Sequence, residues 1–162
     1  MKNRLPSWFR QEIITSAALE KLSLLSEAGV HTVCSEAKCP NLNSCFKEAR
    51  LTFLILGDRC TRNCRFCGVG KLSGGNSEID EHEPYRVSEI VKNLGLKYVV
   101  VPSVTRDDLS DGGSGQFMTT IEAIRDIDRH ICVEALVPDF LGNINSLDKV
   151  IDAKPTVLAH NM

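Results

Sequence analysis

The sequence lacks several features that would indicate common classes of partner. Its 19 Lys and Arg residues nearly balance its 21 Asp and Glu residues, so the overall charge does not indicate binding to nucleic acid or to a membrane surface. The longest apolar runs, such as Tyr98–Val101, have the length of a strand and are too short to span a membrane. No apolar stretch follows the first residues, Met1–Pro6, and no repeat or low-complexity tract occurs. We therefore expect a cytoplasmic protein without a secretory signal and without a nucleic-acid or membrane partner.

Cysteine, by contrast, is abundant and grouped. Seven cysteines occur in the 162 residues. Six of them form two triplets, Cys34, Cys39 and Cys45, followed by Cys60, Cys64 and Cys67. Disulfides are rare in a reducing cytoplasm, so a chain without an export signal keeps its thiols for metal binding or catalysis. The odd total fits six metal ligands and one further cysteine.

The second triplet has the spacing C-x3-C-x2-C, and no fourth cysteine lies close to it. A [4Fe–4S] cluster is normally bound by four cysteines, so three ligands leave one iron free to bind another molecule. A structural zinc site is the main alternative. Zinc sites favour C-x2-C pairs with a second pair farther along the chain, and that second pair is missing here. Two incomplete cysteine sets therefore indicate an enzyme with two iron–sulfur clusters.

Apolar periodicity and turn residues predict an alternation of strands and helices. The predicted strands cover residues 51–56, 97–101, 131–137 and 156–159, and the predicted helices cover residues 7–28, 84–94, 116–128 and 146–152. This order predicts an α/β fold in which about four parallel strands are joined by crossover helices. We divide the chain into an N-terminal extension over residues 1–50, with a helix and the first triplet, and an incomplete core over residues 51–162.

The position of the second triplet suits an active site. Parallel α/β sheets carry their functional residues at the carboxyl ends of the strands, and Cys60 follows the first predicted strand closely. The stretch 68–83 is rich in polar residues and glycine and is interpreted as a loop. We expect its acidic side chains to be solvated; they are Glu78, Asp80, Glu81 and Glu83.

The segment Cys60-Thr-Arg-Asn-Cys64-Arg-Phe-Cys67 resembles the cluster motif of the radical S-adenosylmethionine (SAM) superfamily. Further stretches resemble one family of that superfamily, the lipoyl synthases. They are Val30–Asn41, Leu51–Cys67, Ser103–Gly113, Val133–Phe140 and His160–Asn161. The resemblance extends from about Leu5 to the end of the sequence. It implies a partial (βα) barrel of radical SAM type that is truncated and preceded by a cysteine-bearing extension.

The resemblance implies insertion of two sulfur atoms, at C6 and C8 of an octanoyl group on a lysine of a carrier protein. A [4Fe–4S] cluster on the second triplet would bind SAM and supply the radical that removes hydrogen from carbon. An auxiliary [4Fe–4S] cluster on Cys34, Cys39 and Cys45 would donate the sulfur, which has to be positioned beside the carbon radical in advance. The implied partners are lipoyl domains of 2-oxoacid dehydrogenases, the glycine cleavage H protein and an electron donor such as ferredoxin or flavodoxin.

The resemblance also implies a set of residues that contact SAM or substrate: Phe66, Ser103, Arg106, Asp107, Glu134 and Asn161. Phe66 would lie near the adenine, Ser103 would bond the amino group of SAM, and Glu134 would be directed toward the ribose. Other interpretations of the residues stay open. Phe66 also fits a core aromatic, Arg106 and Asp107 a solvated turn, and Glu134 a buried ion pair.

The sequence departs from the family in one respect that bears on activity. The family completes its auxiliary cluster with a serine in a C-terminal region that has no counterpart here, so we expect this chain by itself to be an inactive fragment. Three alternatives remain: a radical SAM enzyme with another substrate, as in biotin synthase or a thioether-forming relative; a ferredoxin-like electron carrier; and a non-catalytic cluster-binding fragment. The carrier pattern C-x2-C-x2-C-x3-C-P is absent, which argues against the second.

Overall fold

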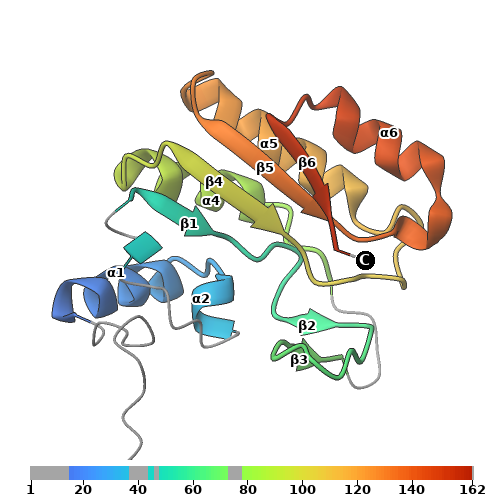
Figure 1. The fold of residues 1–162 in the computed structure, drawn as a ribbon, viewed down its shortest axis with the longest axis horizontal. Helices are drawn as coiled ribbons and strands as arrows, with labels where there is room; N and C mark the ends of the chain where they lie inside the picture. Colours follow the sequence, from blue (N-terminus) through green and yellow to red (C-terminus); the bar gives the residue numbers. More distant parts are fainter. Residues whose placement is uncertain (1–14, 37–43, 46–47, 73–77, 162) are drawn as a thin grey trace, which may run out of the picture.

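A computed structural model describes residues 15–36, 44–45, 48–72 and 78–161 of the chain, and its centre is a sheet of four parallel strands (Figure 1). The spatial order of the strands is β1 (Arg50–Thr52), β4 (Tyr98–Pro102), β5 (Cys132–Val137) and β6 (Val157–His160). Neighbours in this sheet are parallel, which confirms the α/β class and the four predicted strands. The first strand is shorter than predicted. Its pairing with β4 nevertheless continues through the backbone bonds from the N–H of Phe53 to Val100 and from the N–H of Ile55 to Pro102.

Three crossover helices cover one face of the sheet. They are α4 (Glu83–Asn93), α5 (Ser114–Ile127) and α6 (Ile144–Asp152), and α5 packs between the other two (Figure 1). A short 3-10 helix, η2 (Phe140–Gly142), connects β5 to α6. Pro84 occupies the first turn of α4, as predicted, and Gly95 follows its end with a φ of +60°.

The N-terminal part of the described chain lies beside β1. Helix α1 (Ser16–Glu27) begins after Thr15, whose side chain accepts a hydrogen bond from the Ala18 N–H at 3.3 Å. Gly29, with a φ of +65°, lies just beyond its end. The short helix α2 (Val33–Glu36) follows. The helix was predicted to start at Ser7, which lies outside the described residues. Leu25 of α1 is buried in the same hydrophobic cluster as the strands, so this segment packs on the core.

Alternation along β5 separates two faces of the sheet. Val133, Ala135 and Val137 are buried in one cluster with the apolar residues of α5, whereas Glu134 and Leu136 are half-exposed on the opposite face. Helices therefore cover one face, and the face that carries Glu134 and Leu136 is more open. A division of the chain at residue 50 stays a prediction.

A second, very small sheet closes the loop that carries the second triplet. Strand β2 (Arg59–Cys60) pairs in parallel with β3 (Gly70–Lys71), although the sequence predicted a loop beyond residue 67. Strands of two residues leave no periodic pattern to detect. Gly70 permits the pairing, because a Cβ there would lie 3.1 Å from the carbonyl oxygen of Asp58.

Among the helices in the described ranges, none is long and apolar enough to cross a lipid bilayer.

Candidate active site

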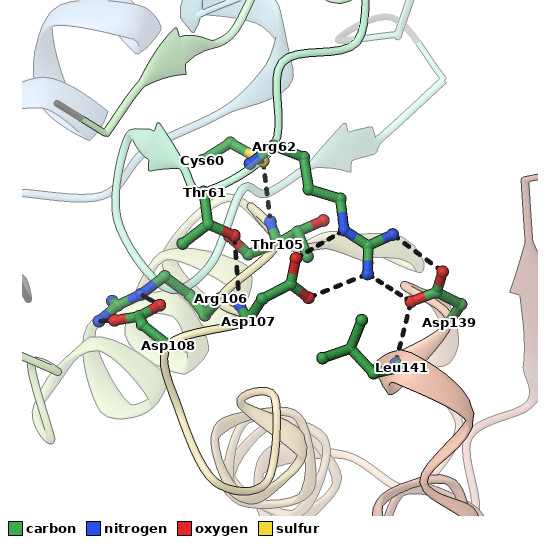
Figure 2. Close-up of polar contacts among 9 residues, drawn as sticks. All are labelled: Cys60, Thr61, Arg62, Thr105, Arg106, Asp107, Asp108, Asp139 and Leu141. Carbon is green, nitrogen blue, oxygen red and sulfur yellow. Dashed lines mark hydrogen bonds and ion pairs between the residues drawn. The ribbon is translucent and has the colours of Figure 1, made fainter.

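Cys60 occupies the end of β2, where two backbone N–H groups point at its sulfur. Thr105 N and Arg62 N lie 3.3 Å and 3.4 Å from Cys60 Sγ (Figure 2). In iron–sulfur proteins, N–H donors directed at a ligand sulfur tune the potential of the cluster that it binds. The surroundings of Cys60 thus fit a cluster ligand.

The residue after Cys60 ties the cysteine loop to the end of β4. Thr61 N donates to the carbonyl oxygen of Thr105 at 3.0 Å, and Thr61 Oγ1 donates to the same oxygen at 2.9 Å. Thr61 Oγ1 also accepts a hydrogen bond from Asp107 N at 3.2 Å. Two consecutive residues of the cysteine motif are therefore fixed against the segment that follows β4.

Arg62 extends this attachment to β5, and it binds two carboxylates at once (Figure 2). Its Nε and Nη2 donate to Asp107 at 2.7 Å and 2.9 Å, and its Nη1 and Nη2 donate to Asp139 at 2.9 Å and 2.6 Å. Asp107 follows β4, and Asp139 follows β5 and also accepts from Leu141 N at 3.0 Å. Arg62 thus joins the cysteine loop to the carboxyl ends of two strands.

The shared guanidinium changes the protonation of this group. Hydrogen bonds from Arg62, and then from the Leu141 N–H, lower the pKa of Asp139 to about 2. The hydrogen bonds that Arg62 donates to Asp139 and Asp107 raise the pKa of Arg62 above its ordinary value. Arg62 and Asp139 therefore both stay charged at neutral pH.

A cavity of about 450 Å³ lies beside the cysteine loop, at the carboxyl ends of β4, β5 and β6. Its size falls within the range of small-molecule sites, roughly 300–1,000 Å³. Three residues predicted to contact SAM, Phe66, Ser103 and Asn161, line it together with Cys64. Ser103 Oγ is buried and has no hydrogen-bond partner among the described residues, so this hydroxyl is available to a ligand. Phe66 is 92% exposed, which rules out its interpretation as a core aromatic.

Arg106 and Asp107 are placed differently from the residues that line this cavity. Arg106 is 1% exposed and forms a bidentate ion pair with Asp108, with two contacts of 2.8 Å (Figure 2). Such burial excludes a solvated turn at Arg106. Asp107 is directed at Arg62. A contact of either residue with SAM stays a prediction.

Glu134 lies within β5 on the open face of the sheet. The hydroxyl of Tyr98 donates a hydrogen bond to its carboxylate, and this bond raises the pKa of Tyr98. The hydrogen-bond partner of Glu134 is therefore Tyr98 on the neighbouring strand β4. This bond explains the placement of Glu134 without a buried ion pair. Contact with the ribose of SAM stays a prediction.

The first triplet is described only in part. Cys34 is buried in α2, Cys45 is half-buried, and Cys39 lies outside the described residues. Within the described ranges, no group of three or more His, Cys, Asp or Glu side chains is arranged to hold a metal ion. The assignment of either triplet to a cluster therefore stays a prediction. The second triplet still fits one, because it places three thiols in one short loop, with N–H donors at Cys60 and a cavity beside Cys64.

Three residues of the site were missed by the sequence analysis. Arg62 lies inside the cysteine motif, and Asp139 follows a proline at the end of a strand, so both positions carried a signal. Glu83 was expected to be solvated, and this expectation is wrong. Glu83 is 4% exposed, and its carboxylate accepts hydrogen bonds from backbone N–H groups just upstream of the cysteine loop.

Comparison with known proteins agrees with the resemblance found in the sequence. The family model for the radical SAM superfamily matches residues 54–162. The chain is 48% identical over 163 residues to lipoyl synthase of Caldicellulosiruptor saccharolyticus, a match that covers 100% of this chain and 56% of the relative. It is 47% identical to lipoyl synthase of Desulfotalea psychrophila, over 97% of this chain and 52% of the relative. It is 51% identical to that of Chloroflexus aggregans, over 87% and 45%. The chain thus spans about half the length of the curated relatives it matches.

Proposed function

This chain belongs to the radical SAM superfamily, and we propose that it acts in lipoyl synthesis, as the part of a lipoyl synthase that carries two iron–sulfur clusters and a SAM pocket. One observation carries the proposal. The cysteine loop lies at the carboxyl ends of the strands, beside a cavity lined by Cys64, Phe66 and the unpartnered hydroxyl of Ser103. Members of this superfamily use a [4Fe–4S] cluster together with SAM.

In the proposed site, each triplet of cysteines holds one cluster. Cys60, Cys64 and Cys67 would hold the cluster that leaves an iron open to SAM, and Cys34, Cys39 and Cys45 would hold the auxiliary cluster. When bound, the reduced first cluster and SAM supply a 5′-deoxyadenosyl radical that removes hydrogen from carbon, and the auxiliary cluster supplies sulfur.

The residues of this chain would bind and orient SAM. Ser103 Oγ lacks a partner in the cavity wall and would accept a hydrogen bond from the amino group of SAM. Phe66 would pack on the adenine, since its ring is exposed at the same cavity. Asn161 would contribute an amide from the end of β6. Arg106 and Asp107 would support the loop that follows β4, and Glu134 would be directed toward the ribose.

The proposed substrate is an octanoyl group on a lysine of a carrier protein, which receives sulfur at C6 and C8. The carriers would be lipoyl domains of 2-oxoacid dehydrogenases and the glycine cleavage H protein, and ferredoxin or flavodoxin would supply electrons. The proposed location is a reducing compartment, the cytoplasm, because thiols that bind clusters have to stay reduced. Support for these choices is the identity of 43–51% to lipoyl synthases along the chain.

Counting iron and sulfide after anaerobic reconstitution tests the proposal. We expect about eight iron and about eight sulfide per chain, because two clusters of four are proposed. Replacing either triplet by alanine should halve both counts. Zinc without sulfide would contradict the proposal.

Lipoyl formation is then measured with an octanoyl-lysyl peptide, SAM and dithionite. For the chain alone we expect no turnover, and turnover above a Cys60→Ala control would overturn that expectation while supporting the reaction. Formation of 5′-deoxyadenosine without sulfur in the peptide would indicate another radical SAM chemistry.

A further inference from the structure

The chain bends just before it enters the cysteine loop, and this turn is costly for the backbone. Leu56 and Gly57 both adopt positive φ values, +68° and +89°. A positive φ is ordinary for glycine but unfavourable for leucine, so the surroundings of Leu56 have to impose it. Only Asp58 separates Gly57 from β2, which ends at Cys60. The direction of this turn therefore sets the position from which the cluster loop begins.

Two contacts hold the turn in this conformation, and one of them is apolar. The Leu56 side chain is buried against Gly113, the residue before α5. A Cβ at position 113 would lie 2.2 Å from Leu56 Cδ1. Only glycine leaves room there for the leucine, and Gly113 itself has a φ of +86°. The apolar contact thus fixes the side chain of Leu56 but not its backbone.

The backbone of the turn is held by Glu83. Its carboxylate accepts hydrogen bonds from Leu56 N at 2.9 Å and from Gly57 N at 3.4 Å. Gln116 of α5 donates to the same carboxylate through Nε2 at 2.9 Å. Glu83 stands in the first turn of α4, where a negative charge is favoured by the helix dipole. These donors replace the water that the carboxylate loses when it is buried.

We propose that Glu83 is a positioning residue for the Cys60–Cys67 loop. By bonding both N–H groups of the turn, it holds Cys60 at the place where Thr105 N can reach its sulfur, and it links that position to α4 and α5. This rests on the proposed function, because the purpose of the placement is to present Cys60 to a cluster. Glu83 itself does not touch the cavity that would receive SAM.

The test compares Glu83→Gln with Glu89→Gln in the full chain. Both substitutions remove one charge from α4, but Glu89 is exposed. In Glu83→Gln, an amide N–H₂ faces the donors of the turn, so one bond becomes a donor–donor contact. The first readout is alkylation of Cys60 in the cluster-free chain, followed by peptide mass spectrometry. We expect the rate at Cys60 to rise about tenfold in Glu83→Gln, the size expected for loss of one buried hydrogen bond to a charged group, and to stay unchanged in Glu89→Gln.

The second readout is the rate at which a chelator removes iron from the reconstituted chain. We expect release to be about tenfold faster in Glu83→Gln, with a far-ultraviolet circular dichroism spectrum like that of the parent. A variant that is only less stable, with Cys60 alkylation and iron release equal to Glu89→Gln, would overturn the proposal. If the parent chain binds no iron, the proposed function fails. The alkylation result then still decides whether Glu83 positions Cys60.

A second variant keeps the test valid if Glu83→Gln does not fold. Gly57→Ala disturbs the turn without a clash, since a Cβ at that position meets nothing within 4 Å, and Gly95→Ala is its match at another positive φ with equal space. We expect Gly57→Ala, but not Gly95→Ala, to accelerate alkylation of Cys60. Equal rates in the two variants would show that this turn does not position Cys60.

Discussion

The chain is held on the two sides of Cys60 by two different kinds of anchor. Upstream, Glu83 is 4% exposed and binds backbone N–H groups of Leu56 and Gly57 in the protein interior. Downstream, the side chain of Arg62 is 31% exposed and binds Asp107 and Asp139 at the edge of the cavity. We call these the upstream anchor and the downstream anchor. The upstream anchor is buried, and the downstream anchor is partly exposed to solvent.

This difference predicts different roles for the two anchors. Breaking a buried hydrogen bond leaves polar groups without a partner and without water. The loss lowers the free energy of unfolding by the full desolvation penalty of those groups. An ion pair that reaches solvent contributes little to that free energy, because water and salt replace it. The upstream anchor should therefore dominate stability, and the downstream anchor should mainly orient the loop that carries Cys64 toward the cavity.

The largest effect is expected from Glu83→Ala. The change leaves Leu56 N, Gly57 N and Gln116 Nε2 without their shared acceptor in a buried place. We expect the free energy of unfolding to fall by about 2–4 kcal/mol in urea denaturation. Glu89→Ala is the control on the exposed side of α4. Equal losses in the two variants would contradict the role of the upstream anchor.

The next effect concerns the apolar contact between Leu56 and Gly113, which holds the same turn as the upstream anchor. Gly113→Ala forces a Cβ to within 2.2 Å of Leu56 Cδ1, whereas Gly142→Ala introduces a Cβ at a φ of +77° with nothing within 4 Å. We expect Gly113→Ala to lose about 1–3 kcal/mol more than Gly142→Ala in the same denaturation experiment, because only the former displaces Leu56. If both variants lose the same amount, backbone strain alone explains the effect and the Leu56 contact is not important.

A smaller effect on stability is expected at the downstream anchor. Arg62→Gln removes both ion pairs, and we expect a loss of about 1 kcal/mol or less at low salt, which shrinks further as salt is added. Arg65→Gln, at an exposed position of the same loop, is the control. The reduced cluster of Arg62→Gln should nevertheless respond to SAM only at higher SAM concentration than the control. A large loss of stability with an unchanged SAM response would reverse the assignment of roles.

The smallest effect is the response of the downstream anchor to acid. The pKa of Asp139 in the folded chain is about 2, which is below its ordinary value. The ion pair therefore stabilises the fold fully at pH values above the ordinary pKa of an aspartate. The contribution is lost as the pH falls through about 2. We therefore expect the difference in unfolding free energy between the parent and Asp139→Asn to be present at pH 5 and to vanish near pH 2. A difference that is constant over this range would contradict the ion pair.

The comparison also separates what could be predicted from the sequence from what could not. Strands and helices followed from local signals, such as the apolar run after Leu51 and the pair Pro84 and Gly95 around α4. Both anchors join residues that are far apart in the sequence. Glu83 binds a residue 27 positions earlier, and Arg62 binds one 77 positions later. No local pattern encodes such contacts, so a buried carboxylate was mistaken for a solvated one.

In the candidate site, too, some residues could be predicted from local sequence and others could not. The positions of the second cysteine triplet and of Ser103 could be predicted, because both follow strands whose carboxyl ends share one edge of the sheet. The resemblance predicted Phe66 near the adenine of SAM; its side chain lines the cavity, and contact with the adenine stays a prediction. The ion pair of Arg106 with Asp108, and the bond from Tyr98 to Glu134, depend on side-chain directions that only the folded chain shows.

The central claim is that Cys60, Cys64 and Cys67 hold a cluster with an iron open to SAM. Electron paramagnetic resonance of the reconstituted, dithionite-reduced chain, recorded with and without SAM, tests it most directly. Replacing the first triplet by alanine leaves only this cluster in the spectrum. We expect a [4Fe–4S] signal that changes shape when SAM is added and that is absent from a Cys60→Ala variant. A signal that is identical with and without SAM, or no iron–sulfur signal in the parent, would contradict it.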